Sequence, residues 1–397
     1  MTARLLDLTR TLRRVGRVAT GVDRVERAYL QRFLADDVPC FALCRTALGY
    51  VLLDRDGMRR FSDSLDGRRE WMPVDLLSRL PGRRGAALQR AESTLRHLAH
   101  ARALPQGLRR MLAQALPGGV DYYNIGHSNL TERVLRSVGA AQGKVHVMLH
   151  DVIPLELPEM QRPGTLRPFR EMVLRVGRMA DRVIYPSEDS RGKAEGWMRG
   201  HGRCPPGVVA PLGVEPAAPD PAALPEGLPP ERPYFLAVGT IEPRKNHAFL
   251  LDLWQDLGPD APPLLICGSR GWNNAAVFAR LDALPPHGPV REVADLTDGA
   301  LSALMAGAAG LLAPSAAEGF GLPPLEALRL GCRVMSSDIP VFRENLAGQA
   351  EIFPVSEREK WLTTIREWGQ DPSRAGNIRD LDGLRWEDHF KIVLRLT

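Results

Sequence analysis

The sequence predicts an α/β protein made of two doubly wound domains, and three observations support this fold class. The chain has 397 residues, more than the roughly 250–300 at which a single hydrophobic core stops growing. Apolar runs of strand length alternate with stretches of helical periodicity, as in parallel sheets with crossover helices. A proline- and glycine-rich stretch at 202–233 is typical of a linker, and the alternation restarts after it. We therefore expect domains at 1–212 and 213–370, and a C-terminal helical segment at 371–397.

The individual elements follow from these patterns in chain order. Helical periodicity predicts helices at 22–34 and 247–257, and the last segment contains a short helical candidate at 385–397. Apolar runs predict strands at 4–8, 38–43, 145–150 and 182–186 in the first domain and at 234–239, 263–268 and 309–314 in the second.

Residues 52–118 fit this alternation poorly and are expected to form a basic insertion in the first domain. The run at 52–61 predicts a β-hairpin with its turn at Asp56 and Gly57. Two interpretations of 83–116 stay open: a surface pair of helices with a solvated basic face, or a basic amphipathic element that lies against anionic lipid. Its arginines are Arg83, Arg84, Arg90, Arg96, Arg102, Arg109 and Arg110.

Composition and termini limit the class of protein. The chain is 44% hydrophobic and 25% charged, which is ordinary for a globular enzyme. No apolar run reaches the roughly 18 residues of a membrane-spanning helix, and the N-terminus lacks the apolar core of a signal peptide. Five scattered cysteines indicate free thiols in a reducing cytosol. We expect a cytoplasmic protein.

Charge is distributed unevenly along the chain. Residues 1–200 hold 34 Lys and Arg against 22 Asp and Glu, a balance of +12, whereas the remainder has a balance of −7. The basic half predicts an anionic partner or surface. Nucleic acid is the weaker explanation, because no recognised nucleic-acid-binding module is present. The Asp-x-Asp triplets at Asp54/Asp56 and Asp380/Asp382 are interpreted as turn residues rather than metal ligands.

The stretch AEGFGLPPLEAL (317–328) carries the first candidate site. It follows a predicted strand, so Glu318 to Gly321 form a loop at a carboxyl strand end, where ligands of open α/β sheets bind. Prolines suit the first turn of the helix that follows, and Gly331 suits its end. Free N–H groups at this helix start favour an anion. Glu326 is placed to accept two sugar hydroxyls; otherwise it only balances the helix dipole, and Glu318 is only a solvated loop carboxylate.

The stretch VGTIEPRKNH (238–247) carries the second candidate site. A strand ends near Thr240, and Asn246 is expected to cap the helix that follows. Between them lie Arg244 and Lys245, two adjacent cations of the kind that a diphosphate leaving group needs. The alternative is a solvated basic turn.

Together these stretches resemble the retaining glycosyltransferases of family 4, also called glycosyltransferase group 1. The resemblance rests on VGTIEPRKNH, PSAAEGFGLPPLEAL and SDIPVFRE (337–344), with looser matches at TGVDRV (20–25), HDVIP (150–154), PSEDSR (186–191) and APLGV (210–214). It implies the GT-B fold, in which two Rossmann-like domains face each other across a cleft. The first domain would bind the acceptor, the second would bind the nucleotide sugar, and the last helix would cross back to the first domain.

The resemblance also implies roles for individual residues. Arg244 and Lys245 would neutralise the diphosphate, Glu326 would hold the ribose, and Glu318 and His150 would face the transferred hexose. For His150 the alternative is a strand-end histidine bonded to local backbone, and for Gly21 it is a simple turn. The implied catalytic residues are Glu318, Arg244, Lys245 and His150, and the implied donor-binding residues are Gly21, Gly239, Thr240, Arg244, Lys245, Gly268, Glu318, Gly319, Phe320, Gly321, Leu322 and Glu326.

The reaction implied is hexosyl transfer with retention of configuration, without metal or cofactor. The residues at 264–277 and 290–301 stand where such enzymes hold the base, and the motifs most resemble bacterial GDP-mannose-dependent mannosyltransferases of surface-polysaccharide synthesis. Other UDP, GDP or dTDP sugars remain alternatives, as do a nucleotide-sugar epimerase and a non-catalytic scaffold. The basic first domain suits a glycan or polyprenyl-diphosphate-linked acceptor at the inner face of the membrane.

Overall fold

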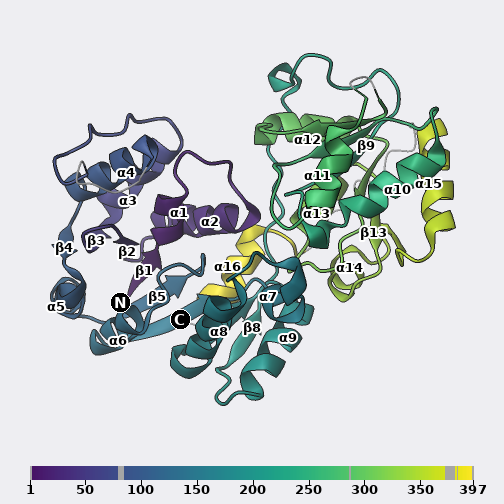
Figure 1. The fold of residues 1–397 in the computed structure, drawn as a ribbon. Coiled ribbons are helices and arrows are strands. Elements are labelled where there is room, and N and C mark those ends of the chain that lie inside the picture. Colours follow the sequence, from purple (N-terminus) through teal and green to yellow (C-terminus); the bar gives the residue numbers. More distant parts are fainter. Residues whose placement is uncertain (1, 79–84, 286–287, 372–380, 382, 396–397) are drawn as a thin grey trace.

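The structure is a computed structural model that describes residues 2–78, 85–285, 288–371, 381 and 383–395. These residues form two α/β lobes, each built around its own β-sheet (Figure 1). The α/β class with two sheet-containing domains, which the alternating pattern predicts, is confirmed.

The first sheet has eight strands in the order β4-β3-β2-β1-β5-β6-β7-β8. Its pairs are parallel, apart from the antiparallel β2–β3 and β3–β4 pairs. The strands are β1 (Ala3–Asp7), β2 (Cys40–Arg45), β3 (Tyr50–Leu53), β4 (Ala101–Ala103), β5 (Val120–Asn124), β6 (Gly143–Met148), β7 (Arg182–Tyr185) and β8 (Gly207–Val209).

Helices cover both faces of this sheet, because successive strand residues point to opposite faces. Leu6 and Tyr123 pack with α2 and α3 on one face, while Leu5 and Tyr122 pack with α5 and α6 on the other. The helices are α1 (Thr9–Arg13), α2 (Gly21–Ala35), α3 (Arg55–Leu65), α4 (Ala86–His97), α5 (Leu108–Ala115), α6 (Glu132–Ala140), α7 (Ile153–Glu156), α8 (Leu166–Met179) and α9 (Glu188–Arg199), with 3-10 turns η1 (Pro105–Gly107) and η2 (Pro158–Met160).

The second sheet has six parallel strands in the order β11-β10-β9-β12-β13-β14. They are β9 (Phe235–Val238), β10 (Leu264–Cys267), β11 (Val290–Val293), β12 (Gly310–Ala313), β13 (Val334–Ser337) and β14 (Glu351–Phe353). The other elements of this lobe are η3 (Pro221–Ala223), η4 (Pro243–Lys245), α10 (His247–Leu257), α11 (Ala275–Asp282), α12 (Asp298–Gly307), α13 (Leu322–Arg329), α14 (Pro340–Leu346) and α15 (Arg358–Gln370).

The last helix, α16 (Trp386–Leu394), packs against the first lobe rather than the second (Figure 1). The Tyr29 hydroxyl of α2 lies 2.8 Å from His389 Nε2, and the Tyr29 and Phe390 rings meet edge to face at 4.9 Å. The chain therefore crosses between the lobes twice. The two crossings lie together, because the Val214 amide donates to the Leu384 carbonyl at 2.9 Å.

The predicted hairpin at 52–61 is wrong. Asp54 is the N-cap of α3, and its side chain accepts a hydrogen bond from the Gly57 amide at 2.9 Å. The Asp-Gly pair thus starts a helix rather than a turn between strands, because a short acidic side chain satisfies a free helical N–H group equally well. The antiparallel turn lies earlier, between β2 and β3. Asp380 and Asp382 lie outside the described residues.

The predicted linker at 202–233 contains an element that sequence reasoning missed. β8 pairs with β7 in parallel and forms an edge of the first sheet. Its three residues are flanked by prolines, which hid a short edge strand. β8 ends at Val209 and β9 starts at Phe235.

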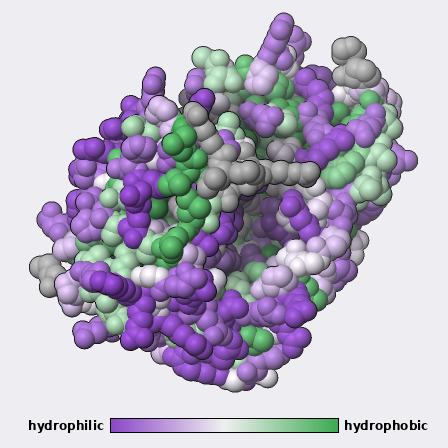
Figure 2. All heavy atoms as spheres, turned by 60° about the vertical axis from the view of Figure 1, so that its left-hand side comes forward, coloured by the Kyte–Doolittle hydropathy of each residue, from purple (hydrophilic) through white to green (hydrophobic). Residues whose placement is uncertain are grey.

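The basic insertion is more closely integrated with the core than a surface helical pair would be. Ala91 and Leu95 of α4 are buried, and the Arg96 guanidinium makes a two-point contact with Asp75 at 2.7 and 2.6 Å. Arg83 and Arg84 lie outside the described residues. Figure 2 shows a face that is mostly hydrophilic, with one strip of strongly apolar side chains near its centre. Among the described residues, no helix has the length and apolarity to cross a membrane.

Candidate active site

Glu318, Arg244 and Lys245 meet at the carboxyl ends of two neighbouring strands of the second sheet. β9 leads to Arg244 and Lys245, and the adjacent β12 leads to Glu318. Lys245 Nζ donates to Glu318 Oε1 at 2.6 Å, and Arg244 Nη1 donates to Glu318 Oε2 at 2.7 Å. The Ala316 amide also donates to the Arg244 carbonyl at 2.7 Å, which ties the two loops together. The sequence-predicted pair of cations is therefore held in place by the sequence-predicted glutamate.

The charge state of this cluster follows from burial and pairing. Burial of Glu318 would raise its pKa, but Arg244 and Lys245 outweigh burial and lower the pKa to about 2. The Ser315 hydroxyl donates to the same carboxylate at 2.8 Å, and Glu242 accepts from Arg244 Nε at 2.7 Å. Glu318 is thus an anion at neutral pH, and it orients two cations toward the loop at the domain boundary.

Backbone N–H groups add to the positive character of this loop. Among the described residues, the amides of Gly319, Phe320, Gly321 and Leu322 have no hydrogen-bond acceptor. The last of these begins α13, and two prolines occupy its first turn as predicted. Free donors at a helix start bind phosphate oxygens. The helix ends as predicted before Gly331, whose φ of 76° allows the Cys332 amide to reach the Ala327 carbonyl.

The glycines of the two motifs are needed for close packing. A side chain on Gly268 would place its Cβ 2.0 Å from the Gly239 carbonyl oxygen, and one on Gly321 would lie 2.7 Å from the Phe342 ring. Gly239 itself has a φ of +131°, and Thr240 follows it. These residues shape the strand-end loops rather than present side chains to a ligand. Phe320 is likewise buried, and its carbonyl accepts from Asn345 at 2.8 Å.

Asn246 does not cap α10 as predicted. It stands at the N-cap position with a φ of 55°, and its side chain makes no capping hydrogen bond. The preceding η4 turn sets this left-handed conformation, which asparagine tolerates better than most residues.

His150 lies in the first lobe at the lobe boundary, where its backbone carbonyl approaches Gly319. It follows β6, and its Nε2 donates to the Ile125 carbonyl at 2.8 Å. Burial lowers the pKa of His150 to about 3, so the ring is neutral and Nδ1 has a free lone pair. The hydrogen bond to the backbone, which the alternative interpretation of His150 predicts, therefore satisfies Nε2 and leaves Nδ1 as an acceptor. His127 lies beside it, with ring centroids 5.3 Å apart.

The two lobes touch at the Glu318 loop. The hydroxyls of Ser187 and Ser190, at the start of α9, each lie 3.0 Å from the Gly319 carbonyl. A Cβ on Gly319 would lie 2.5 Å from the His150 carbonyl oxygen. Only glycine allows this approach, which brings His150 and Glu318 to the same boundary.

Glu326 and Gly21 meet partners across the same boundary. Arg24 Nη2 of α2 donates to Glu326 Oε1. Burial raises the pKa of Glu326, although Arg24 opposes this. Gly21 is the first residue of α2, and a Cβ there would lie 3.3 Å from Leu322 at the start of α13. Two helix N-termini therefore approach each other here, which favours a bound anion.

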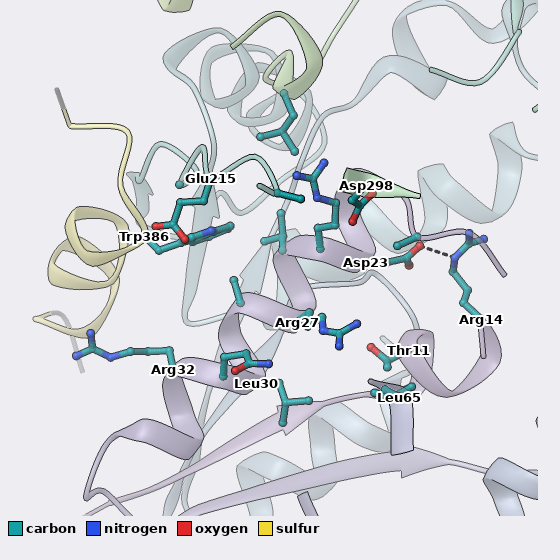
Figure 3. A pocket seen from close by; sticks show the side chains of 18 of the residues that line it. Thr11, Arg14, Asp23, Arg27, Leu30, Arg32, Leu65, Glu215, Asp298 and Trp386 are labelled. Carbon is teal, nitrogen blue, oxygen red and sulfur yellow. Dashed lines mark hydrogen bonds and ion pairs between the residues drawn. The ribbon is translucent and has the colours of Figure 1, made fainter. Parts of the chain in front are cut away.

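A cavity of about 960 Å³ lies beside the Arg24–Glu326 pair, between α2, α13 and α16 (Figure 3). Arg27, Asp298 and Trp386 lie around it, and Asp23 is joined to Arg14. Its volume is that of a small-molecule site. Glu326 lines this cavity, whereas Glu318 and Lys245 do not. The structure thus places the predicted donor-binding residues in two neighbouring groups rather than in one open pocket.

The segment expected to hold the base makes other contacts. Trp272 Nε1 donates to the Met160 carbonyl of the first lobe at 3.1 Å, and its ring stacks under Arg162 at 4.5 Å. Arg270 is bound to Glu292 and Asp282. The contacts of Trp272 with Met160 and Arg162 join the two lobes on a second side.

Sequence reasoning missed three residues of the site. Arg24 lies in TGVDRV, which directed attention to Gly21 alone, and its partner is 302 positions away. Glu242 lies inside the diphosphate motif and fixes Arg244. Burial raises the pKa of Asp151, which follows His150 and faces Gly319. A buried acid inside HDVIP was visible in the sequence, but its contact with Gly319 was not.

Comparison with known proteins agrees with this geometry. Residues 224–380 match the family described as glycosyl transferases group 1. The serotype-specific mannosyltransferase WbdA of Escherichia coli is 29% identical over 282 residues, which cover 65% of this chain and 34% of WbdA. The O-antigen chain mannosyltransferase RfbU of Salmonella typhimurium is 32% identical over 150 residues, covering 37% of this chain and 41% of RfbU. The chain therefore spans about a third of the length of WbdA.

The fold has counterparts among solved structures. Anabaena HepE in complex with UDP-glucose superimposes with a TM-score of 0.62 at 14% identity, over 99% of this chain and 95% of HepE. This likeness extends over both lobes. The comparisons therefore show the GT-B fold for both lobes and a similarity of residues 224–380 to the glycosyl transferases group 1.

Proposed function

We propose that this chain is a retaining hexosyltransferase that takes its sugar from a nucleotide diphosphate donor. The observation that carries the proposal is the Glu318–Arg244–Lys245 cluster at a carboxyl strand edge. Beside it, the backbone of His150 meets Gly319 across the lobe boundary. Two fixed cations and the free amides of 319–322 suit a departing diphosphate, whose charge grows as the bond to the sugar breaks.

The chemical step can be assigned to these groups. The acceptor hydroxyl oxygen forms a bond to the anomeric carbon while the bond from that carbon to the diphosphate oxygen breaks. The nucleoside diphosphate leaves with the electron pair, stabilised by Arg244 and Lys245. A donor phosphate oxygen takes the acceptor's proton, and His150 Nδ1 accepts a hexose hydroxyl. The two cations take the charge-neutralising role, so the reaction needs no divalent metal.

Mannose from GDP-mannose is the favoured donor. The named relatives are mannosyltransferases, and the motifs resemble those of GDP-mannose enzymes. Glu326 would hold the ribose after release from Arg24. The acceptor would be a glycan or lipid-linked oligosaccharide of surface-polysaccharide synthesis at the inner membrane face.

A thermal-shift panel tests the proposal first. GDP, UDP, dTDP and ADP, each with common sugar conjugates, are added without metal. We expect GDP-mannose and GDP to stabilise wild type and Lys245→Ala to lose the shift. If only another nucleotide raised the melting temperature, that nucleotide would replace GDP in the proposed donor. If no nucleotide raised it, the result would contradict the proposed transferase function. Release of a changed sugar without acceptor would favour an epimerase.

A further inference from the structure

The first sheet has a second crevice, lined by Arg13, Arg45, Tyr50, Asn129, Thr131 and Arg133, with a volume of about 490 Å³. We call it the arginine cavity. It lies at the carboxyl ends of β1, β2 and β5. In the sheet β1 stands between β2 and β5, so the strand order changes direction at β1. Such a switch in strand order opens a ligand crevice in α/β sheets.

The charge of the arginine cavity is unbalanced. Three guanidinium groups line it, and no carboxylate does. Within the described part of the chain, Arg13, Arg45 and Arg133 form no ion pair, whereas Arg10 and Arg14 on the same helix as Arg13 both pair with Asp23. Arg10 and Arg14 are thus neutralised, whereas among the described residues the three arginines of the cavity have no carboxylate partner.

The cavity wall is held in a fixed geometry. Arg45 Nη1 donates to the carbonyls of Thr46 and Gly49 at 2.5 and 2.8 Å, and the guanidinium lies 5.0 Å over the Tyr50 ring. Asn129 donates to the buried Asp7 at 2.8 Å. Burial raises the pKa of Asp7, and hydrogen bonds from Thr9, Asn129 and Tyr122 oppose this rise. Planar guanidinium groups placed in this way suit bidentate binding of phosphate oxygens.

The arginine cavity is connected to the reaction centre by one short loop. His127 packs on His150, and the next residue, Ser128, accepts from Asn124 at 2.7 Å before the chain reaches Asn129. The loop leaves β5 and leads into α6, whose N-cap is Thr131. A group bound in the cavity would therefore belong to the substrate that approaches His150 from the first lobe.

We propose that the arginine cavity binds the diphosphate group of the acceptor. The assignment of this ligand to an acceptor rests on the proposed transferase function. The diphosphate that joins a lipid to a glycan is a diester with two negative charges, and the three arginines of the cavity supply more than enough positive charge to bind it. The donor diphosphate is a separate ligand, held by Arg244 and Lys245 of the other lobe.

The test measures binding of inorganic pyrophosphate, farnesyl diphosphate and GDP by calorimetry. The variant Arg13→Ala/Arg133→Ala removes two exposed cavity arginines. Its control, Arg109→Ala/Arg110→Ala, removes two exposed arginines from α5 and so loses the same charge. We expect the cavity variant to bind farnesyl diphosphate at least tenfold more weakly and GDP unchanged, while the control binds both as wild type does.

The arms separate the possible failures. The proposal would be overturned if the cavity variant and wild type bound farnesyl diphosphate with equal affinity. It would also be overturned if farnesol displaced farnesyl diphosphate from the wild-type protein. Loss of pyrophosphate binding alone, with farnesyl diphosphate unaffected, would mean a free-phosphate site and also overturn it. If GDP and the other nucleotides fail to bind wild type while the cavity variant still loses farnesyl diphosphate, the proposed transferase fails and the anion site stands.

Discussion

Arg24 and Glu326 form an ion pair that joins the helix α2 of the first lobe to the helix α13 of the second. The glutamate is almost fully buried, and the arginine is about one-third exposed, with side-chain exposures of 6% and 31%. The pair borders the larger cavity. A ribose that binds Glu326 must therefore share or replace the contact with Arg24. Donor binding is thus coupled to an ion pair that holds the two lobes together.

We expect Glu326→Gln to weaken nucleotide binding about tenfold, or about 1.4 kcal/mol, because the neutral amide loses its charge-assisted hydrogen bonds. Glu367→Gln, an exposed change on α15, is the control and should bind normally. Calorimetry with GDP measures the effect. Unchanged affinity would leave Glu326 with a purely structural role.

Lys245→Ala should remove at least 99% of turnover while the protein stays folded. The variant loses one of the two cations that stabilise the leaving diphosphate, and Glu318 keeps Arg244 as its partner. Lys144→Ala, an exposed lysine of β6, should retain full activity. Initial rates measure turnover, and circular dichroism shows whether the variant is folded. Near-normal turnover would refute the assignment of Lys245 to the diphosphate.

Gly319→Ala should separate the lobes at the Glu318 loop. Its Cβ would lie 2.5 Å from the His150 carbonyl oxygen, so the loop cannot dock. We expect turnover to fall at least tenfold and small-angle scattering to show a larger radius of gyration. Gly192→Ala on α9 meets no atom within 4 Å and should change neither. A compact, active Gly319→Ala protein would show that the loop contact is dispensable.

Glu26 should make stability fall as pH rises. Burial raises its pKa to about 8, against 4.5 for an ordinary glutamate. Between these values the folded state binds more protons than the unfolded state, so the free energy of unfolding falls by up to about 1.4 kcal/mol per pH unit. Glu26→Gln should flatten this dependence in urea titrations at pH 5, 6.5 and 8. An equal slope in both proteins would contradict the raised pKa.

Much of the fold could be predicted because buried parallel strands and their crossover helices have strong local patterns. The helix predicted at 247–257 has those bounds, and β7 is one residue shorter than the strand predicted at 182–186. Failures occurred where a single contact decides the structure. Asp54 turns an apparent hairpin into a helix, and β8 exists only because β7 pairs with it.

The site could be predicted as a set of residues but not as an arrangement. Two motifs next to parallel strands named Glu318, Arg244 and Lys245, and the structure brings all three together. Nothing local to Glu326 indicated that Arg24 is its partner, because pairs this distant depend on how two lobes dock. The same holds for the contact of Gly319 with His150.

The return of α16 to the first lobe has a consequence for biosynthesis. Tyr29 and Phe390 share one hydrophobic cluster, yet a ribosome makes them hundreds of codons apart. The first lobe therefore emerges with an uncovered apolar face, and it stays uncovered until the second lobe has been translated. Because domains usually fold in order of synthesis, the second lobe completes its sheet while the first still awaits its final helix.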